Sequence, residues 1–193
     1  MYPEYVKVED KKYKINTNFK VAIECNRIAQ DETIGDMERG LAIIYTLFGE
    51  EGINTPEHYE KLLELAKKYL LCGKEEDISN KELDMDYVQD YGYIWASFMS
   101  DYNGMDIDKT EIHWWKFNEL MNGLSNSEIG NCCVLNRIRN LRTFDVSLIK
   151  DEKERSKIIK AKNQVALKRK EKKVELTEEQ QKSVDEFYKS LGF

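Results

Sequence analysis

The sequence has few of the residues on which reaction chemistry depends. Its 193 residues include two histidines, two prolines and four cysteines. No GxGxxG, GxxxxGK[ST] or GxSxG pattern occurs, which excludes the usual phosphate loops and the nucleophile elbow. His58 and His113 are the only imidazoles, and neither lies in a known catalytic signature. We therefore expect a protein that is not an enzyme, with no catalytic residue and no cofactor.

The cysteines and carboxylates also lack the spacing of a metal site. Cys25, Cys72, Cys132 and Cys133 form no CxxC or Cys/His arrangement, so we interpret them as buried free thiols in a reducing compartment. The run from 101 to 112 resembles a calcium loop only superficially, because its glycine is at the fourth position and its twelfth residue is isoleucine. We predict no metal ion.

Long apolar runs are missing, and acidic residues outnumber basic ones. No stretch approaches the roughly 20 apolar residues that a membrane span needs, and the N-terminus has no charged-then-apolar leader. The formal net charge is −6, which argues against general nucleic-acid binding because that affinity comes from neutralising phosphates. We expect a soluble cytosolic protein without membrane contact.

The residues that are abundant favour helices. Lys, Glu, Leu and Ile are common, and apolar residues recur at spacings of three and four, so we predict a mostly α, compact helical domain. One exception is the stretch from 5 to 15, whose period-two alternation around a polar turn predicts a small N-terminal β-hairpin. In the helix after Gly35, we expect one apolar face formed by Met37, Leu41, Ile44, Tyr45 and Phe48. Another helix should be capped by Thr55 and end near Gly73.

Charge divides the chain into two predicted parts. Residues 1–149 form the helical core with the hairpin, and a charged linker lies at about 74–84. Residues 150–193 form a basic helix followed by a short amphipathic tail helix. The segment 150–173 has eleven basic and four acidic residues, a local charge of +7, and few apolar residues. We therefore expect this helix to project from the core. A Ser-x-x-Glu capping box at 125–128 predicts a further helix that ends near Arg142.

The stretch from Asp90 to Leu124 holds all three tryptophans. Its two helical patterns are joined by Asn103-Gly104 and are predicted to lie side by side. The seam between them should contain Tyr91, Trp95, Phe98, Trp114 and Phe117. Trp115 is about 100° out of phase with that buried side. Exposed aromatic residues are favoured at binding hot spots, so the candidate partner contacts are Tyr93, Ile112 and Trp115.

Several runs in this stretch resemble a family of bacteriophage tail assembly chaperones, which long-tailed siphophages encode between their tail-tube and tape-measure genes. The runs are YIWASF at 93–98, YNGMDI at 102–107, and IHWWKF at 112–117 continuing through Ser125. Residues 8–18 and Cys72-Gly73-Lys74 are also similar. The resemblance covers roughly residues 1–155. The chain departs from the family pattern at 126–133 and from Val174 onward.

The resemblance implies a non-enzymatic chaperone in the host cytoplasm, absent from the mature virion. It would bind the tape-measure protein, keep it soluble and be displaced as tail-tube subunits polymerise. Homo-oligomerisation stays open. Two alternatives remain: a structural tail component retained in the virion, or a nucleic-acid-binding regulator acting through 150–173. Nucleic acid is the less favoured partner because the basic helix lacks interleaved aromatic residues for base stacking.

Overall fold

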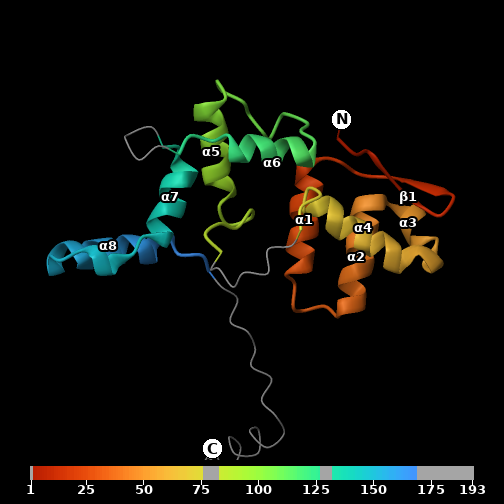
Figure 1. Ribbon diagram of the computed structural model, residues 1–193, viewed down its shortest axis with the longest axis horizontal. Helices are drawn as coiled ribbons and strands as arrows, with labels where there is room; N and C mark the ends of the chain where they lie inside the picture. The colour runs from red at the N-terminus through yellow and green to blue at the C-terminus, as the bar shows by residue number, and fades with distance from the viewer. Residues whose placement is uncertain (1, 76–82, 127–131, 169–193) are drawn as a thin grey trace, which may run out of the picture.

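The computed structural model describes residues 2–75, 83–126 and 132–168, and it confirms a mostly helical fold with a small N-terminal hairpin (Figure 1). The elements in chain order are β1 (Tyr5–Val8), β2 (Lys11–Lys14), α1 (Phe19–Ala29), α2 (Asp36–Phe48), α3 (Glu50–Ile53), the 3-10 turn η1 (Pro56–His58), α4 (Tyr59–Leu70), α5 (Tyr91–Asp101), α6 (Trp114–Asn122), α7 (Val134–Thr143), the 3-10 turn η2 (Val146–Leu148) and α8 (Glu152–Val165).

The hairpin is stabilised by one buried face. β1 and β2 are antiparallel, with Val6 opposite Tyr13, and Glu9 has a φ of 51° in the tight turn between them. Val8 and Tyr13 are buried in the core. The Tyr13 hydroxyl shares a hydrogen bond of 2.7 Å with Nδ1 of the buried His58. A two-stranded hairpin is marginal alone, so this contact with the segment before α4 fixes its position.

The helix boundaries follow local capping signals. The Asn18 side chain accepts a hydrogen bond from the Lys20 backbone N–H (2.9 Å) at the start of α1. The predicted helix after Thr55 begins as the turn η1 before continuing as α4. The Thr55 side chain forms no capping hydrogen bond, contrary to prediction, because its hydroxyl donates to the Glu51 carbonyl (3.2 Å) instead. It ends as expected at Gly73, whose φ is +73° and whose N–H donates to the Lys68 carbonyl (2.9 Å).

The N-terminal helices form one packed layer, in which α1 and α4 both lie against α2 and α6 lies against α1 (Figure 1). Ile44 and Leu47 of α2 are almost fully buried in it. A Cβ on Gly52 would lie 2.9 Å from Ile44 Cγ2 and 3.0 Å from Phe48 Cβ. Glycine at position 52 therefore lets α3 turn back closely on α2.

The predicted side-by-side pairing of the two aromatic helices is wrong. α6 packs on α1 and α5 packs on α7, and Figure 1 shows α5 and α6 running across one another. The connection between them occupies residues 102–113 and is long enough to redirect the chain. Their rings still meet, because Phe98 and Phe117 stack with centroids 5.4 Å apart.

The C-terminal part differs from prediction at the start of α7. Ser125 and Asn126 are not helical, and α7 begins at Val134 with the Cys133 sulfur accepting from the Asn136 N–H (3.4 Å). α8 has no buried residue and extends away from the body (Figure 1). Most of the predicted linker and the whole predicted tail helix lie outside the described residues, as does the Glu128 end of the capping box.

Candidate partner-binding surface

The structure places the three predicted contact residues at or near the core. Ile112 is only 4% exposed, and its carbonyl accepts a hydrogen bond from the Phe19 N–H (2.9 Å). Ile112 is therefore a core residue at the N-terminus of α1 in this structure, and its side chain is not accessible to a partner. Tyr93 and Trp115 are partly buried and pack against the core. Partner binding by these two residues stays a prediction.

Trp115 joins α6 to the end of α4. Its indole N–H donates to the Tyr69 carbonyl (3.0 Å), and its ring stacks on Tyr69 with centroids 6.1 Å apart. A Cβ on Gly73 would lie 3.3 Å from Cη2 of Trp115. The neighbouring Trp114 donates instead to the Leu70 carbonyl (2.9 Å). Two consecutive tryptophans thus bond consecutive carbonyls of α4, so Trp115 has a structural role.

The Trp115→Phe variant is expected to lower the free energy of unfolding by about 1 kcal/mol, because it keeps most of the ring and loses the hydrogen bond to Tyr69. Urea unfolding followed by circular dichroism measures this change. The matched control is Tyr5→Phe, which removes a hydroxyl from a side chain that is 44% exposed. Equal stability of the two variants would contradict a structural role for the indole N–H.

Large apolar side chains are exposed on α2 and α4. Met37 is 75% exposed, Tyr45 is 56% exposed and Leu63 of α4 is 39% exposed. We call these three residues the α2–α4 apolar surface. The sequence pattern had placed Met37 and Tyr45 on the buried face, and this is wrong. The buried face is rotated toward Gly40, where a Cβ would lie 3.4 Å from Leu63 Cδ2, so α4 approaches α2 at the glycine.

A groove of about 1070 Å³ begins at Tyr45. It runs between the exit of the hairpin, the C-terminal end of α2 and the segment that precedes α6. Its lining is mixed, with Val21, Phe48 and Ile112 among the apolar side chains and Lys14, Glu51 and Glu111 among the charged ones. Tyr45 is therefore the residue of the α2–α4 apolar surface at which that surface meets the groove.

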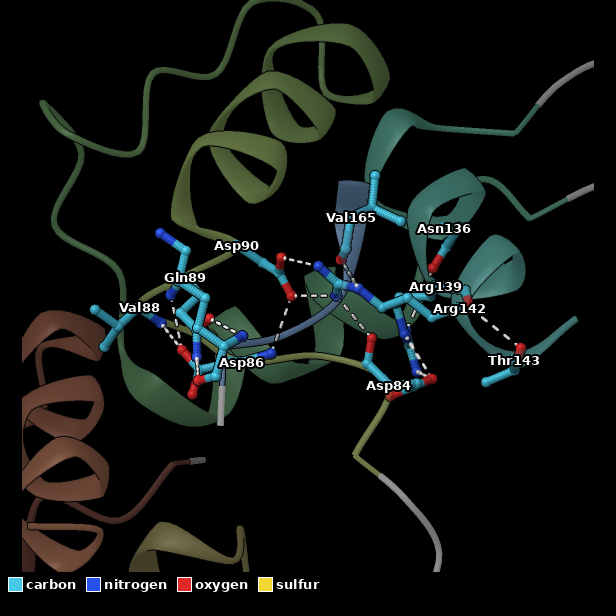
Figure 2. Close-up of polar contacts among 11 residues, drawn as sticks. Asp84, Asp86, Val88, Gln89, Asp90, Asn136, Arg139, Arg142, Thr143 and Val165 are labelled. Carbon is cyan, nitrogen blue, oxygen red and sulfur yellow. Dashed lines mark hydrogen bonds and ion pairs between the residues drawn. The ribbon is translucent and has the colours of Figure 1, made fainter. Parts of the chain in front are cut away.

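A buried ion pair organises the other end of the molecule (Figure 2). Both terminal nitrogens of the Arg142 guanidinium donate to the two carboxylate oxygens of Asp90, each at 2.7 Å. The side chains are 10% and 1% exposed. This pairing raises the pKa of Arg142 above its ordinary value, chiefly through the hydrogen bonds to Asp90. The pair ties α7 to the N-terminus of α5.

The same guanidinium also reaches two other segments. Arg142 Nη1 donates to the Asp84 carbonyl (2.9 Å), and Nε donates to the Val165 carbonyl at the end of α8 (2.6 Å). Beyond α8, Gln89 and Lys168 exchange two hydrogen bonds of 3.1 and 2.8 Å. All five donor positions of arginine point in fixed directions, so one side chain fixes the relative positions of three chain segments.

The described residues contain no group of three or more His, Cys, Asp or Glu side chains that could hold a metal ion. Burial raises the pKa of the Cys25 thiol to about 12. The pKa of Cys72 is raised to about 11, again mainly by burial. These two thiols are therefore protonated near neutral pH. In the part of the chain that is described, no helix is long and apolar enough to cross a membrane.

A protein-family model described as Bacteriophage Gp15 protein matches residues 2–167. The chain belongs to this family. The match extends from before β1 to beyond the end of α8, so the Gp15 region contains the α2–α4 apolar surface, the groove and the Arg142 network. No curated protein and no solved structure matches the chain.

Proposed function

We propose that this Gp15 family protein is a non-enzymatic tail assembly chaperone, which binds the tape-measure protein through the α2–α4 apolar surface and the adjoining groove. The observation that carries the proposal is the exposure of Met37 and Tyr45 on α2, a helix that buries Ile43, Ile44, Leu47 and Phe48 in the core. Membership of a phage protein family supports the setting, and the resemblance of the central stretch supplies the partner.

The chemistry of this surface suits a helical, apolar partner. Methionine adapts its shape to different neighbours, and tyrosine combines a large apolar ring with a hydroxyl, so both are common at binding sites. A groove beside such residues can receive the apolar face of an amphipathic helix. One contact of this size is weak. Many copies of the chaperone, each bound weakly along the long tape-measure protein, would together cover it and could be displaced one after another as tail-tube subunits bind.

The chaperone is proposed to act in the host cytoplasm and to leave before the particle is complete. The alternative of a structural tail component gives the opposite result in one measurement. Mass spectrometry of purified virions should find tail-tube and tape-measure peptides without peptides of this chain. Its presence at a fixed ratio to the tail-tube protein would favour the structural role.

Coexpression tests the proposed surface directly. Wild-type protein is expected to keep a tape-measure fragment in the soluble fraction. A variant with both Met37→Asp and Tyr45→Asp should bind the fragment at least about tenfold more weakly than the wild type does. Asp at position 37 lies in the first turn of α2, where a negative charge is favourable to the helix.

The matched control for that experiment is Val88→Asp. Val88 is 52% exposed and lies outside the α2–α4 apolar surface, so this variant adds a charge at an exposed apolar site elsewhere. It should retain the wild-type affinity. Circular dichroism and unfolding curves check that each variant is folded. Equal binding by all three proteins would contradict the proposed surface.

A further inference from the structure

The exposed side of α8 carries a row of lysines. Lys153, Lys157 and Lys160 are spaced by four and three residues, which places them on one helix face. All three are exposed, and among the described residues none forms an ion pair. The opposite side faces the body, where Arg155 donates to the Ile149 carbonyl (3.1 Å) and Lys162 donates to the Phe144 carbonyl (2.5 Å). The lysine row therefore points away from the body.

α8 is held at its far end as well as along this inner side. Val165 accepts the hydrogen bond from Arg142, and Lys168 is paired with Gln89. No residue of α8 is buried. The fold thus presents a fixed, basic helix face on which none of the residues that the structure describes is packed.

Acidic residues are concentrated at the opposite end of the molecule. Residues 31–64 contain nine acidic and two basic residues, a net charge of −7, whereas residues 150–168 contain seven basic and three acidic residues, a net charge of +4. Figure 1 shows α8 at one end of the long axis and α2, α3 and α4 at the other. The two regions therefore cannot reach one another within one chain.

Three acidic side chains of η1 and α4 have the same sequence spacing as the lysines. Glu57 of η1 and Glu60 and Glu64 of α4 follow one another at three and four residues, and all are exposed. Glu64 also forms a surface ion pair with Lys61 (2.6 Å), which solvent screens. Read in the reverse direction, this spacing equals that of the lysine row. An antiparallel pairing brings Lys153 to Glu64, Lys157 to Glu60 and Lys160 to Glu57.

The charges at the helix ends favour the same direction. The first turn of α8 contains Glu152 and Glu154, and the last turn of α4 contains Lys68. In the antiparallel arrangement these acidic and basic turns are neighbours. A parallel arrangement would place the acidic start of α8 on the acidic start of α4 and repel it.

We propose that α8 of one copy packs antiparallel on α4 of a second copy. Different surfaces meet in this contact, so it is heterologous: the copy that supplies α8 keeps its own α4 surface free, and the copy that supplies α4 keeps its own α8 free. The chain would therefore associate head to tail. A helix of the length of α8 spans about 21 Å, and a contact of this size lies at the low end of specific interfaces. Association should be weak, concentration dependent and sensitive to salt.

Two charge-reversal variants test the contact. One carries Lys153→Glu, Lys157→Glu and Lys160→Glu, and the other carries Glu57→Lys, Glu60→Lys and Glu64→Lys. Each variant alone opposes like charges across the contact, so sedimentation velocity should show a dissociation constant at least about tenfold higher than that of the wild type. In an equimolar mixture, the reversed, acidic α8 of the first variant can pack on the reversed, basic α4 of the second. The basic α8 of the second variant can likewise pack on the acidic α4 of the first, so the mixture should recover association.

Recovery by mixing also shows that both variants are folded. Wild-type protein that stays monomeric at every concentration would overturn the proposal, as would a mixture no more associated than its components. A monomeric wild type that binds duplex DNA, with binding lost on reversal of the lysines, would overturn it in favour of a nucleic-acid partner. The assay contains no tape-measure protein, so its failure leaves the proposed chaperone function unaffected.

Discussion

The Arg142→Ala variant is expected to lose about 3–5 kcal/mol of unfolding free energy, because it leaves the Asp90 carboxylate buried without its cation. Asp90 is 1% exposed and receives both terminal nitrogens of Arg142. Within the described part of the chain, its carboxylate also accepts one hydrogen bond from the Asp86 N–H (3.0 Å). Little else can compensate a charge in that position.

Arg139 provides the matched control. It is three residues earlier on α7 and pairs with Asp84, but those side chains are 36% and 35% exposed. Solvent screens such a pair, so Arg139→Ala should cost no more than about 1 kcal/mol. Urea unfolding with unchanged m-values compares the two variants. Equal costs would show that the Arg142 pair is no more important than a surface salt bridge.

The Arg142→Ala variant should also change which part of the chain unfolds locally first. Arg142 supplies the hydrogen bond to Val165 at the end of α8, and α8 buries no residue of its own. Hydrogen exchange in α8 should therefore accelerate more than exchange in α1. Arg142→Lys should resemble the alanine variant in this respect, because lysine cannot form the bidentate pair and reach the Val165 carbonyl together.

The sequence predicted the features that depend on neighbouring residues. Alternation between 5 and 15 predicted the hairpin, and Gly73 marked a helix end because its positive φ is a local requirement. The basic helix was also predicted to project, since it has too few apolar residues to pack. Each of these inferences uses residues within about one helical turn or one strand pair.

The errors involve contacts between distant residues. Met37 and Tyr45 fit a helical stripe, but the face that α2 buries is decided by Gly40, which admits Leu63 of α4. In the same way, the helical phase of Trp115 predicted an exposed side chain, whereas Tyr69 and Gly73 of the α4 end lie against its ring and leave it partly buried. The apolar pattern of one helix contains no information about which other helix of the chain will pack against it.

The Arg142–Asp90 pair had a weak signal in the sequence. Arg142 follows Leu135 and Ile138 at helical spacing, and Asp90 precedes Ile94 and Phe98 in the same way. Opposite charges at apolar-stripe positions of two helices are typical of a buried ion pair, because neither charge can be buried alone. What the sequence could not supply was that α5 and α7 are the helices that meet.

The second large effect is expected from Phe117→Ala, which should lower the free energy of unfolding by about 3–5 kcal/mol. Phe117 is fully buried, and its ring stacks on Phe19 of α1 at 4.4 Å and on Phe98 of α5 at 5.4 Å between centroids. Trp114 lies 5.9 Å away. Phe117 is thus the ring through which α1, α5 and α6 contact one another.

Phe144→Ala is the matched control, because it removes the same side chain from a position that is 42% exposed. Its cost should be well under half that of Phe117→Ala. Benzene distinguishes an open cavity from a collapsed one. If Phe19 and Phe98 keep their positions, the vacated space is apolar and shaped for an aromatic ring, so benzene should raise the melting temperature of Phe117→Ala and leave that of Phe144→Ala unchanged. A large destabilisation that benzene does not reverse would mean that α1 and α5 move toward one another and fill the space that Phe117 vacates.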